Sequence, residues 1–174
     1  MSYDINCLNC PYNHQKHLID GSFQSSRSNP PVVLENNGSD VLLVFLAPGN
    51  KEWEVGKAIQ PTKKTGGSAG VRVENSWKRK GKSRTDFNII NTVQCFPGNN
   101  GDRDLEPNTK AISSCSNRLE VIIKSSEYCK ILAFGEVAQQ IIFKLLGSKD
   151  YEKRVIAMRH PNGGVKNKDL DGLW

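Results

Sequence analysis

The residues of this chain best suited to chemistry are its cysteines. Of the five, four have informative spacing: Cys7, Cys10, Cys95 and Cys115. The first two form a C-x-x-C pair, and His14 and His17 follow it closely. Packed thiols, a zinc site made by the four N-terminal residues, and an iron–sulfur cluster held by four thiolates are all compatible with this pattern. The zinc alternative leaves Cys95 and Cys115 without a role.

Three short stretches follow apolar, strand-like runs. The longest run, at residues 41–49, reads VLLVFLAPG and ends in Ala47, Pro48 and Gly49. The stretches at 91–97 and 158–162 follow similar runs. Ligands of open parallel sheets bind outside the carboxyl ends of the strands. We therefore expect these three loops to line one pocket.

Apolar periodicity predicts the elements that position these loops. Strands are predicted at residues 41–47, 87–93, 130–134 and 154–158. One helix is predicted to begin at Pro107, and a second to run from Val137 to Gly147. Residues 21–40 and 50–86 are polar and are predicted to be irregular. Strands that alternate with helices indicate parallel α/β layers with right-handed crossovers, and a chain of 174 residues fits one domain, 1–174.

Charge favours an acidic partner. Lys and Arg number 24 against 18 Asp and Glu, and nucleic acid is the first partner that such an excess suggests. Five cations fall within residues 77–84, as a solvated loop or as a loop that contacts phosphates: Lys78, Arg79, Lys80, Lys82 and Arg84. No run approaches the roughly 18 apolar residues of a membrane span, and the polar N-terminus lacks a signal peptide. We expect a cytoplasmic protein that does not bind membranes, whose cysteines serve metal, catalysis or packing rather than disulfides.

Taken in order, these pieces resemble the uracil-DNA glycosylase superfamily, specifically its iron–sulfur (family 4) branch. The matching features are the N-terminal C-x-x-C, the strand that ends in APG with an acid three residues later, an N-x-x-x-C-x-P motif, and an HP dipeptide after the last strand. They read here as Cys7 and Cys10, Ala47-Pro48-Gly49 with Glu52, Asn91 to Pro97 with Cys115 beyond it, and His160-Pro161. The match extends over nearly the whole chain. It implies a three-layer α/β/α fold with a central four-stranded parallel sheet.

The chain departs from the family pattern around the expected pocket. The acid of the usual GEAPG is replaced by Leu46, and the usual HPS ends in Asn162. The stretch that normally carries a base-stacking phenylalanine reads GKAI at residues 56–59, so Trp53 is either a substitute for that ring or a core residue. An insertion-like segment follows at residues 61–67. These departures bear on the substrate more than on the fold.

The resemblance implies specific roles. Asn91 would read the Watson–Crick edge of a flipped base, since an amide offers both a donor and an acceptor. His160 would stabilise the charge of the departing base, and Glu52, with Glu54 in reserve, would orient the attacking water. The expected substrate contacts are Ala47, Pro48, Gly49, Asn50, Trp53 and Asn162. Gly163 and Gly164 would let their loop approach the DNA backbone, beside the five cations of residues 77–84.

We therefore expect a monomeric, monofunctional DNA glycosylase that excises uracil or a related modified pyrimidine. A structural [4Fe–4S] cluster on Cys7, Cys10, Cys95 and Cys115 is the expected cofactor, with zinc as the alternative. Two other functions remain open at this point: a glycosylase for a bulky, hypermodified base, and a non-catalytic DNA-binding protein of the same fold.

Overall fold

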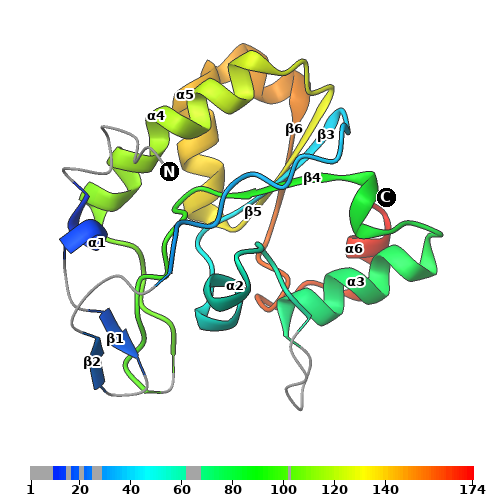
Figure 1. Cartoon of the computed structure of the whole chain (residues 1–174). Coiled ribbons are helices and arrows are strands. Elements are labelled where there is room, and N and C mark those ends of the chain that lie inside the picture. Colours follow the sequence, from blue (N-terminus) through cyan, green and yellow to red (C-terminus); the bar gives the residue numbers. More distant parts are fainter. Residues whose placement is uncertain (1–9, 15–16, 20–21, 25–28, 62–67, 102) are drawn as a thin grey trace.

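The computed structural model of the protein describes residues 10–14, 17–19, 22–24, 29–61, 68–101 and 103–174 (Figure 1). Its centre is a four-stranded sheet in the order β4-β3-β5-β6, and every neighbouring pair is parallel. The strands are β3 (Val41–Phe45), β4 (Asn88–Asn91), β5 (Lys130–Phe134) and β6 (Val155–Met158). A separate antiparallel pair, β1 (His17–Ile19) and β2 (Ser22–Gln24), lies near the N-terminus.

Helices cover both faces of this sheet. On one side lie α2 (Asn50–Val55), α3 (Ala69–Arg79) and α6 (Asn167–Asp171), and on the other lie α4 (Thr109–Ser125) and α5 (Glu136–Arg154) (Figure 1). The short helix α1 (Pro11–His14) packs near α4, and a 3-10 turn, η2 (Arg84–Asp86), precedes β4. The predicted three-layer α/β/α fold with its four-stranded parallel sheet is confirmed.

The strand sequences alternate between two hydrophobic cores. Leu43 and Phe45 of β3 point into the core shared with α2 and α3, whereas Leu42 and Val44 point into the core shared with α4 and α5. Successive side chains of a strand leave on opposite faces, so a strand covered on both sides must be apolar throughout. Every residue of β3 from Leu42 to Phe45 is buried, as the continuous apolar run predicted.

The irregular conformation predicted for residues 50–86 is wrong, because α2 and α3 lie within it. The buried face of α3 consists of Ala69, Gly70, Val73, Ser76 and Trp77. Its spacing is helical, but three of the five side chains are small or polar, so hydrophobicity alone does not reveal the period. Residues 77–79 form the last turn of α3 rather than part of a loop.

Several predicted boundaries also shift; β4, for example, ends at Asn91 rather than at residue 93. Strand β3 ends at Phe45 rather than at residue 47, because the carbonyl of Leu46 already accepts hydrogen bonds from Val93 N (2.9 Å) and Thr92 Oγ1 (2.6 Å) in the loop after β4. Gly147 does interrupt α5, with φ of 72°, but helical residues resume beyond it and continue to Arg154.

None of the helices in the described part of the chain is long and apolar enough to cross a membrane.

Candidate active site

The carboxyl ends of the strands meet around a topological switch point. From β3 the chain moves to β4 on one side, and then returns past β3 to β5 on the other. A crevice at such a point is where open α/β sheets bind ligands. Residues 46–49 leave the sheet there, with Pro48 buried and Ala47 and Gly49 partly buried, and α2 begins at Asn50.

Asn91 occupies the last position of β4, opposite Phe45 of β3, and is only 1% exposed. Its Nδ2 is buried and has no hydrogen-bond partner among the described residues. Asn88, at the other end of the same strand, differs: its Nδ2 donates to the Ser39 carbonyl and to Tyr128 Oη, and its Oδ1 accepts from the amides of Asn37 and Ser39. A buried amide donor without an acceptor costs stability. The unsatisfied Nδ2 of Asn91 is therefore available to a ligand, whereas the hydrogen bonds of Asn88 stabilise the fold.

His160 follows β6, and its geometry fixes its protonation state. The backbone amide of Asn162 donates to His160 Nδ1 at 3.3 Å, so this nitrogen carries no proton. His160 is exposed, yet the protein around its ring desolvates it enough to lower its pKa, which favours the neutral form at pH 7. Neutral imidazole with a bare Nδ1 carries its proton on Nε2, which is therefore a donor.

The loop that carries His160 is held from within. Gly163 N donates to the His160 carbonyl at 2.6 Å, and a side chain at position 163 would press on that same oxygen at 3.0 Å. The guanidinium of Arg72, on α3, donates to the carbonyls of Pro161 and Val165. Gly164 has φ of 78° and is exposed, like the side chain of Asn162. No sequence motif marks Arg72, because its partners are backbone carbonyls about 90 residues away.

His160 lies over the end of β5, because a Cβ placed on Gly135 would be 3.8 Å from the His160 Cβ. From β5 to β4 is two inter-strand spacings, about 10 Å. Asn91 and His160 therefore lie at the same end of the sheet, on either side of β3.

Glu52 is a partly buried carboxylate in the first turn of α2. Its Oε1 accepts the backbone N–H of Gln60 at 3.1 Å, and its Oε2 lies against Gly49. Desolvation, together with the negative charge of nearby Asp104, raises the pKa of Glu52 despite hydrogen bonds from backbone amides. Glu54, the reserve candidate, is exposed and paired with Lys51 (2.7 Å) and Asn50 (2.8 Å).

Trp53 lies in the core. It is 1% exposed, and its ring packs against Phe96 with centroids 5.9 Å apart. Trp53 is therefore a core residue, rather than a substitute for the base-stacking phenylalanine.

Three of the four candidate metal ligands converge. Cys10, Cys95 and Cys115 are buried in one cluster with Tyr12, whose pKa is raised mainly by burial and further by all three thiols. This thiol set has the chemistry that iron–sulfur clusters require. Among the described residues, however, no group of three His, Cys, Asp or Glu side chains is arranged to hold a metal ion. Cys7, and the side chains of His14 and His17, lie outside the described residues.

The five cations of residues 77–84 have different environments. Lys78 and Arg79 are exposed but form ion pairs, with Glu74 at 2.9 Å and Asp171 at 2.7 Å. Lys80 and Lys82 are exposed, and within the described structure neither forms an ion pair. Arg84 is turned inward, where it binds Glu35 and two backbone carbonyls.

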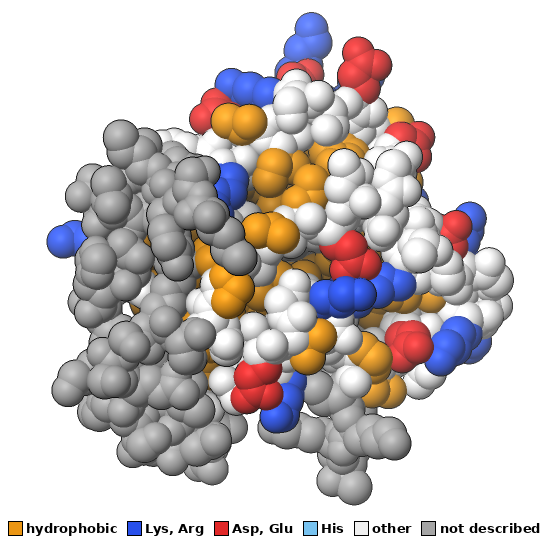
Figure 2. Space-filling model, in the orientation of Figure 1, with side chains coloured by type: hydrophobic (Ala, Val, Ile, Leu, Met, Phe, Trp, Pro, Cys, Tyr) orange, Lys and Arg blue, Asp and Glu red, His pale blue; other side chains and the backbone are white. Residues whose placement is uncertain are grey.

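A cavity of about 240 Å³ lies beside α3. Ile59, Gln60 and Gly70 line it, together with Lys78 and Lys82. Asn91, His160 and Glu52 do not line this cavity. On the face shown in Figure 2, acidic and basic side chains are interspersed among exposed hydrophobic ones.

Comparison with known proteins agrees with this geometry. The Type-4 uracil-DNA glycosylase of Pyrobaculum aerophilum is 26% identical over 145 residues, which are 83% of this chain and 63% of that relative. A family model described as "Uracil DNA glycosylase superfamily" matches residues 33–174, a span that includes all four strands of the central sheet, Asn91 and His160. The chain belongs to the uracil DNA glycosylase superfamily.

Proposed function

We propose that this protein is a DNA glycosylase that flips out uracil, or a related modified pyrimidine, and hydrolyses its N-glycosidic bond. The observation that carries the proposal is the pairing of an unsatisfied amide, Asn91, with a neutral Nε2–H donor, His160, across one sheet end. Membership of the superfamily and the likeness to a Type-4 uracil-DNA glycosylase support it.

The proposed reaction needs three contributions. Asn91 Nδ2 donates to a carbonyl on the edge of the flipped base and holds the base in place. As the bond from C1′ to the base nitrogen breaks, its electron pair leaves with the base, and His160 Nε2–H donates to the oxygen on which the negative charge collects. A water oriented by the Glu52 carboxylate adds to C1′ and loses a proton, and the departing base anion takes up one proton, so the products are an abasic site and the neutral free base.

The remaining predicted contacts complete the proposed site. Backbone groups of Ala47, Pro48, Gly49 and Asn50 would border the base, with Asn162 at the mouth. Trp53, being buried, would support this wall from behind rather than stack on the base. Gly163 and Gly164 would let the His160 loop approach the DNA backbone.

A [4Fe–4S] cluster on Cys7, Cys10, Cys95 and Cys115 is the proposed cofactor. Bound there, it would supply structure rather than catalysis, because it would tie the N-terminal segment to the loop after β4 and to α4. The convergence of three buried thiols supports this proposal.

Replacing one ligand tests the cluster. Cys115→Ser should abolish the visible absorption of anaerobically purified protein and lower the folded yield, since metal binding and folding are coupled. The matched control is Cys129→Ser, because Cys129 is exposed and bonded to Asp40, apart from the thiol cluster. Wild-type protein that contains zinc and no iron would contradict the cluster.

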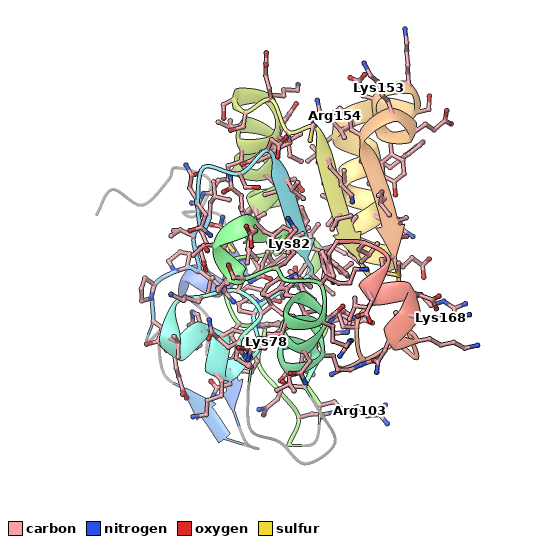
Figure 3. All side chains as sticks on the ribbon, turned by 90° about the vertical axis from the view of Figure 1, so that its right-hand side faces the viewer. Lys78, Lys82, Arg103, Lys153, Arg154 and Lys168 are labelled. Carbon is pink, nitrogen blue, oxygen red and sulfur yellow. The ribbon has the colours of Figure 1, made fainter. Side chains whose placement is uncertain are left out.

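The cations at the end of α3 are proposed to contact DNA phosphates. Replacing Lys80 and Lys82 with Ala should weaken binding to all sequences about equally and reduce the salt slope by roughly one unit for each lost contact. The double variant Lys149→Ala/Lys153→Ala removes equal charge from α5, on the opposite side of the sheet, where Figure 3 labels Lys153. If both double variants reduce the salt dependence of DNA binding equally, only net charge matters and Lys80 and Lys82 have no special contact with DNA.

A base screen tests the proposed activity. Single- and double-stranded oligonucleotides that carry uracil, hypoxanthine or a modified cytosine are incubated with the protein, and abasic sites are then measured. Cleavage at uracil is the expected result. Cleavage only at a larger modified base would instead fit the replacement of the usual acid by Leu46, and binding without cleavage of any substrate would mean a DNA-binding protein.

A further inference from the structure

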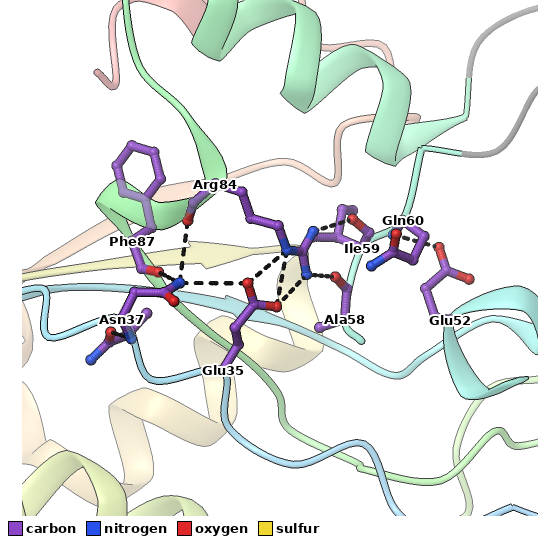
Figure 4. Close-up of polar contacts among 9 residues, drawn as sticks. Glu35, Asn37, Glu52, Ala58, Ile59, Gln60, Arg84 and Phe87 are labelled. Carbon is purple, nitrogen blue, oxygen red and sulfur yellow. Dashed lines mark hydrogen bonds and ion pairs between the residues drawn. The ribbon is translucent and has the colours of Figure 1, made fainter. Parts of the chain in front are cut away.

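Arg84 connects the edge of the sheet to the segment that precedes α3. Its Nε donates to both carboxylate oxygens of Glu35, at 2.8 and 2.9 Å, and its Nη2 to Glu35 Oε2 at 2.8 Å (Figure 4). The same guanidinium donates to the carbonyl of Ile59 at 3.0 Å and to that of Ala58 at 2.5 Å. All three of its nitrogens therefore have acceptors inside the protein.

Glu35 is itself firmly placed. It pairs with Ile89 of β4 through two backbone hydrogen bonds, of 2.9 and 3.0 Å. Burial alone would raise the pKa of Glu35, but the hydrogen bonds and charge of Arg84 outweigh burial and lower it. The carboxylate is thus ionised at neutral pH and holds Arg84 in one orientation.

The segment that Arg84 holds is strained. Ile59 has φ of 49°, and within the described chain it is the one residue other than glycine with positive φ. A β-branched residue in that region is a genuine outlier, which persists only where its surroundings enforce it. Two such constraints are visible: Arg84 binds the Ile59 carbonyl, and Gly70 of α3 leaves room for the Gln60 carbonyl, which any side chain at position 70 would strike.

This strained turn delivers one hydrogen bond to the candidate active site. The residue after Ile59 is Gln60, whose backbone N–H donates to Glu52 Oε1 at 3.1 Å. If Ile59 relaxed to negative φ, the peptide that carries this N–H would rotate away from the carboxylate.

We infer that Arg84 is a positioning residue for Glu52: by holding the Ala58 and Ile59 carbonyls, it fixes the turn that presents the Gln60 amide to the Glu52 carboxylate. The catalytic consequence rests on the proposed function, whereas the structural linkage does not. Arg84 therefore acts inside the protein and is set apart from its neighbours Lys80 and Lys82.

The linkage has a signature in the titration of Glu52. A hydrogen bond to the ionised form lowers the pKa of a carboxyl, so losing the Gln60 bond should raise the pKa of Glu52 above its already raised value. The other charged group that acts on Glu52 in the described structure is Asp104, whose negative charge opposes the ionisation of Glu52. The acid limb of the pH–rate profile should then move to higher pH.

The first measurement uses the wild-type protein. In an NMR titration, the Glu52 carboxyl carbon and the Gln60 amide proton should change shift with the same midpoint, above 4.5, the ordinary pKa of a Glu carboxyl. A Gln60 amide proton that does not respond when Glu52 titrates would overturn the inference.

The second measurement compares variants. Arg84→Lys keeps the positive charge, but an ammonium group cannot bind Glu35 and two carbonyls at once as the guanidinium does. If that variant does not fold, the double variant Glu35→Gln/Arg84→Gln replaces it, because it leaves no buried charge unpaired. In each, the Glu52 midpoint should rise by about one pH unit, and cleavage below that midpoint should slow about tenfold, with recovery at higher pH. The control, Lys124→Met, breaks a surface pair with Glu120 on α4 and should change neither quantity.

The outcomes separate the two proposals. An unchanged Glu52 midpoint in the folded variants overturns the positioning role of Arg84. A raised midpoint with no shift of the pH–rate profile supports the positioning role and contradicts the catalytic role of Glu52.

Discussion

His160→Ala should slow the cleavage step by roughly 10² or more while leaving the affinity for DNA nearly unchanged. In the proposed reaction, the Nε2–H of His160 would face a negative charge that exists only once the base begins to leave. A donor that acts only in the transition state affects the chemical step and not binding. Single-turnover cleavage rates and DNA dissociation constants measure the two effects separately.

Two further variants sharpen this test. His160→Gln retains a side-chain N–H and should recover part of the rate, which a purely structural histidine would not predict. Lys153→Ala, an exposed change on α5, is the control for altered charge. Wild-type rates in His160→Ala would place the leaving-group donor elsewhere.

Much of the fold could be predicted because burial on both faces leaves a clear trace in sequence. The run at residues 41–45 had to be apolar to lie between two helical layers, and the same holds for β5. Helix α3 left a weaker trace, because Gly70 and Ser76 occupy positions on its buried face. Close approach of the Gln60 carbonyl requires Gly70, and hydrophobic periodicity does not report such requirements.

The candidate site was less predictable, because contacts between distant segments decide the chemistry. Sequence motifs pointed to His160, but its tautomer depends on the backbone N–H of Asn162. Arg72 and Arg84 both bind backbone carbonyls, which every residue possesses, so no residue type in the sequence marks their partners. A run of cations likewise does not show that Arg84 points inward while Lys82 points outward.

Asn91→Asp should lower activity on uracil by a factor on the order of 10² at neutral and higher pH. An ionised carboxylate cannot donate to a carbonyl of the base, and it repels the anion that forms as the base leaves. Burial should raise the pKa of the new side chain, because Asn91 is 1% exposed. Lowering the pH through that pKa should restore a protonated donor and with it part of the activity.

The control variants isolate the amide. Asn91→Ala removes the donor without adding charge, so its loss of activity should not depend on pH in this way. Asn117→Asp adds the same charge at an exposed position of α4 and should remain as active as wild type. A cytosine edge, whose exocyclic amine can donate to a carboxylate, should be accepted better by Asn91→Asp than by wild type. A uniform loss across pH for Asn91→Asp would mean that Asn91 does not touch the base.

Stability gives an independent measure of the same assignment. Asn91 Nδ2 has no acceptor among the described residues. Asn91→Ala loses packing, but it also removes an unsatisfied buried donor, which offsets part of the resulting loss of unfolding free energy. Asn88→Ala instead leaves the partners of four hydrogen bonds unsatisfied. Urea unfolding should therefore show a larger loss of unfolding free energy for Asn88→Ala, by about 1–3 kcal/mol, whereas only Asn91→Ala should abolish cleavage in folded protein. Equal losses of stability would mean that Asn91 is bonded within the fold and is not held ready for a ligand.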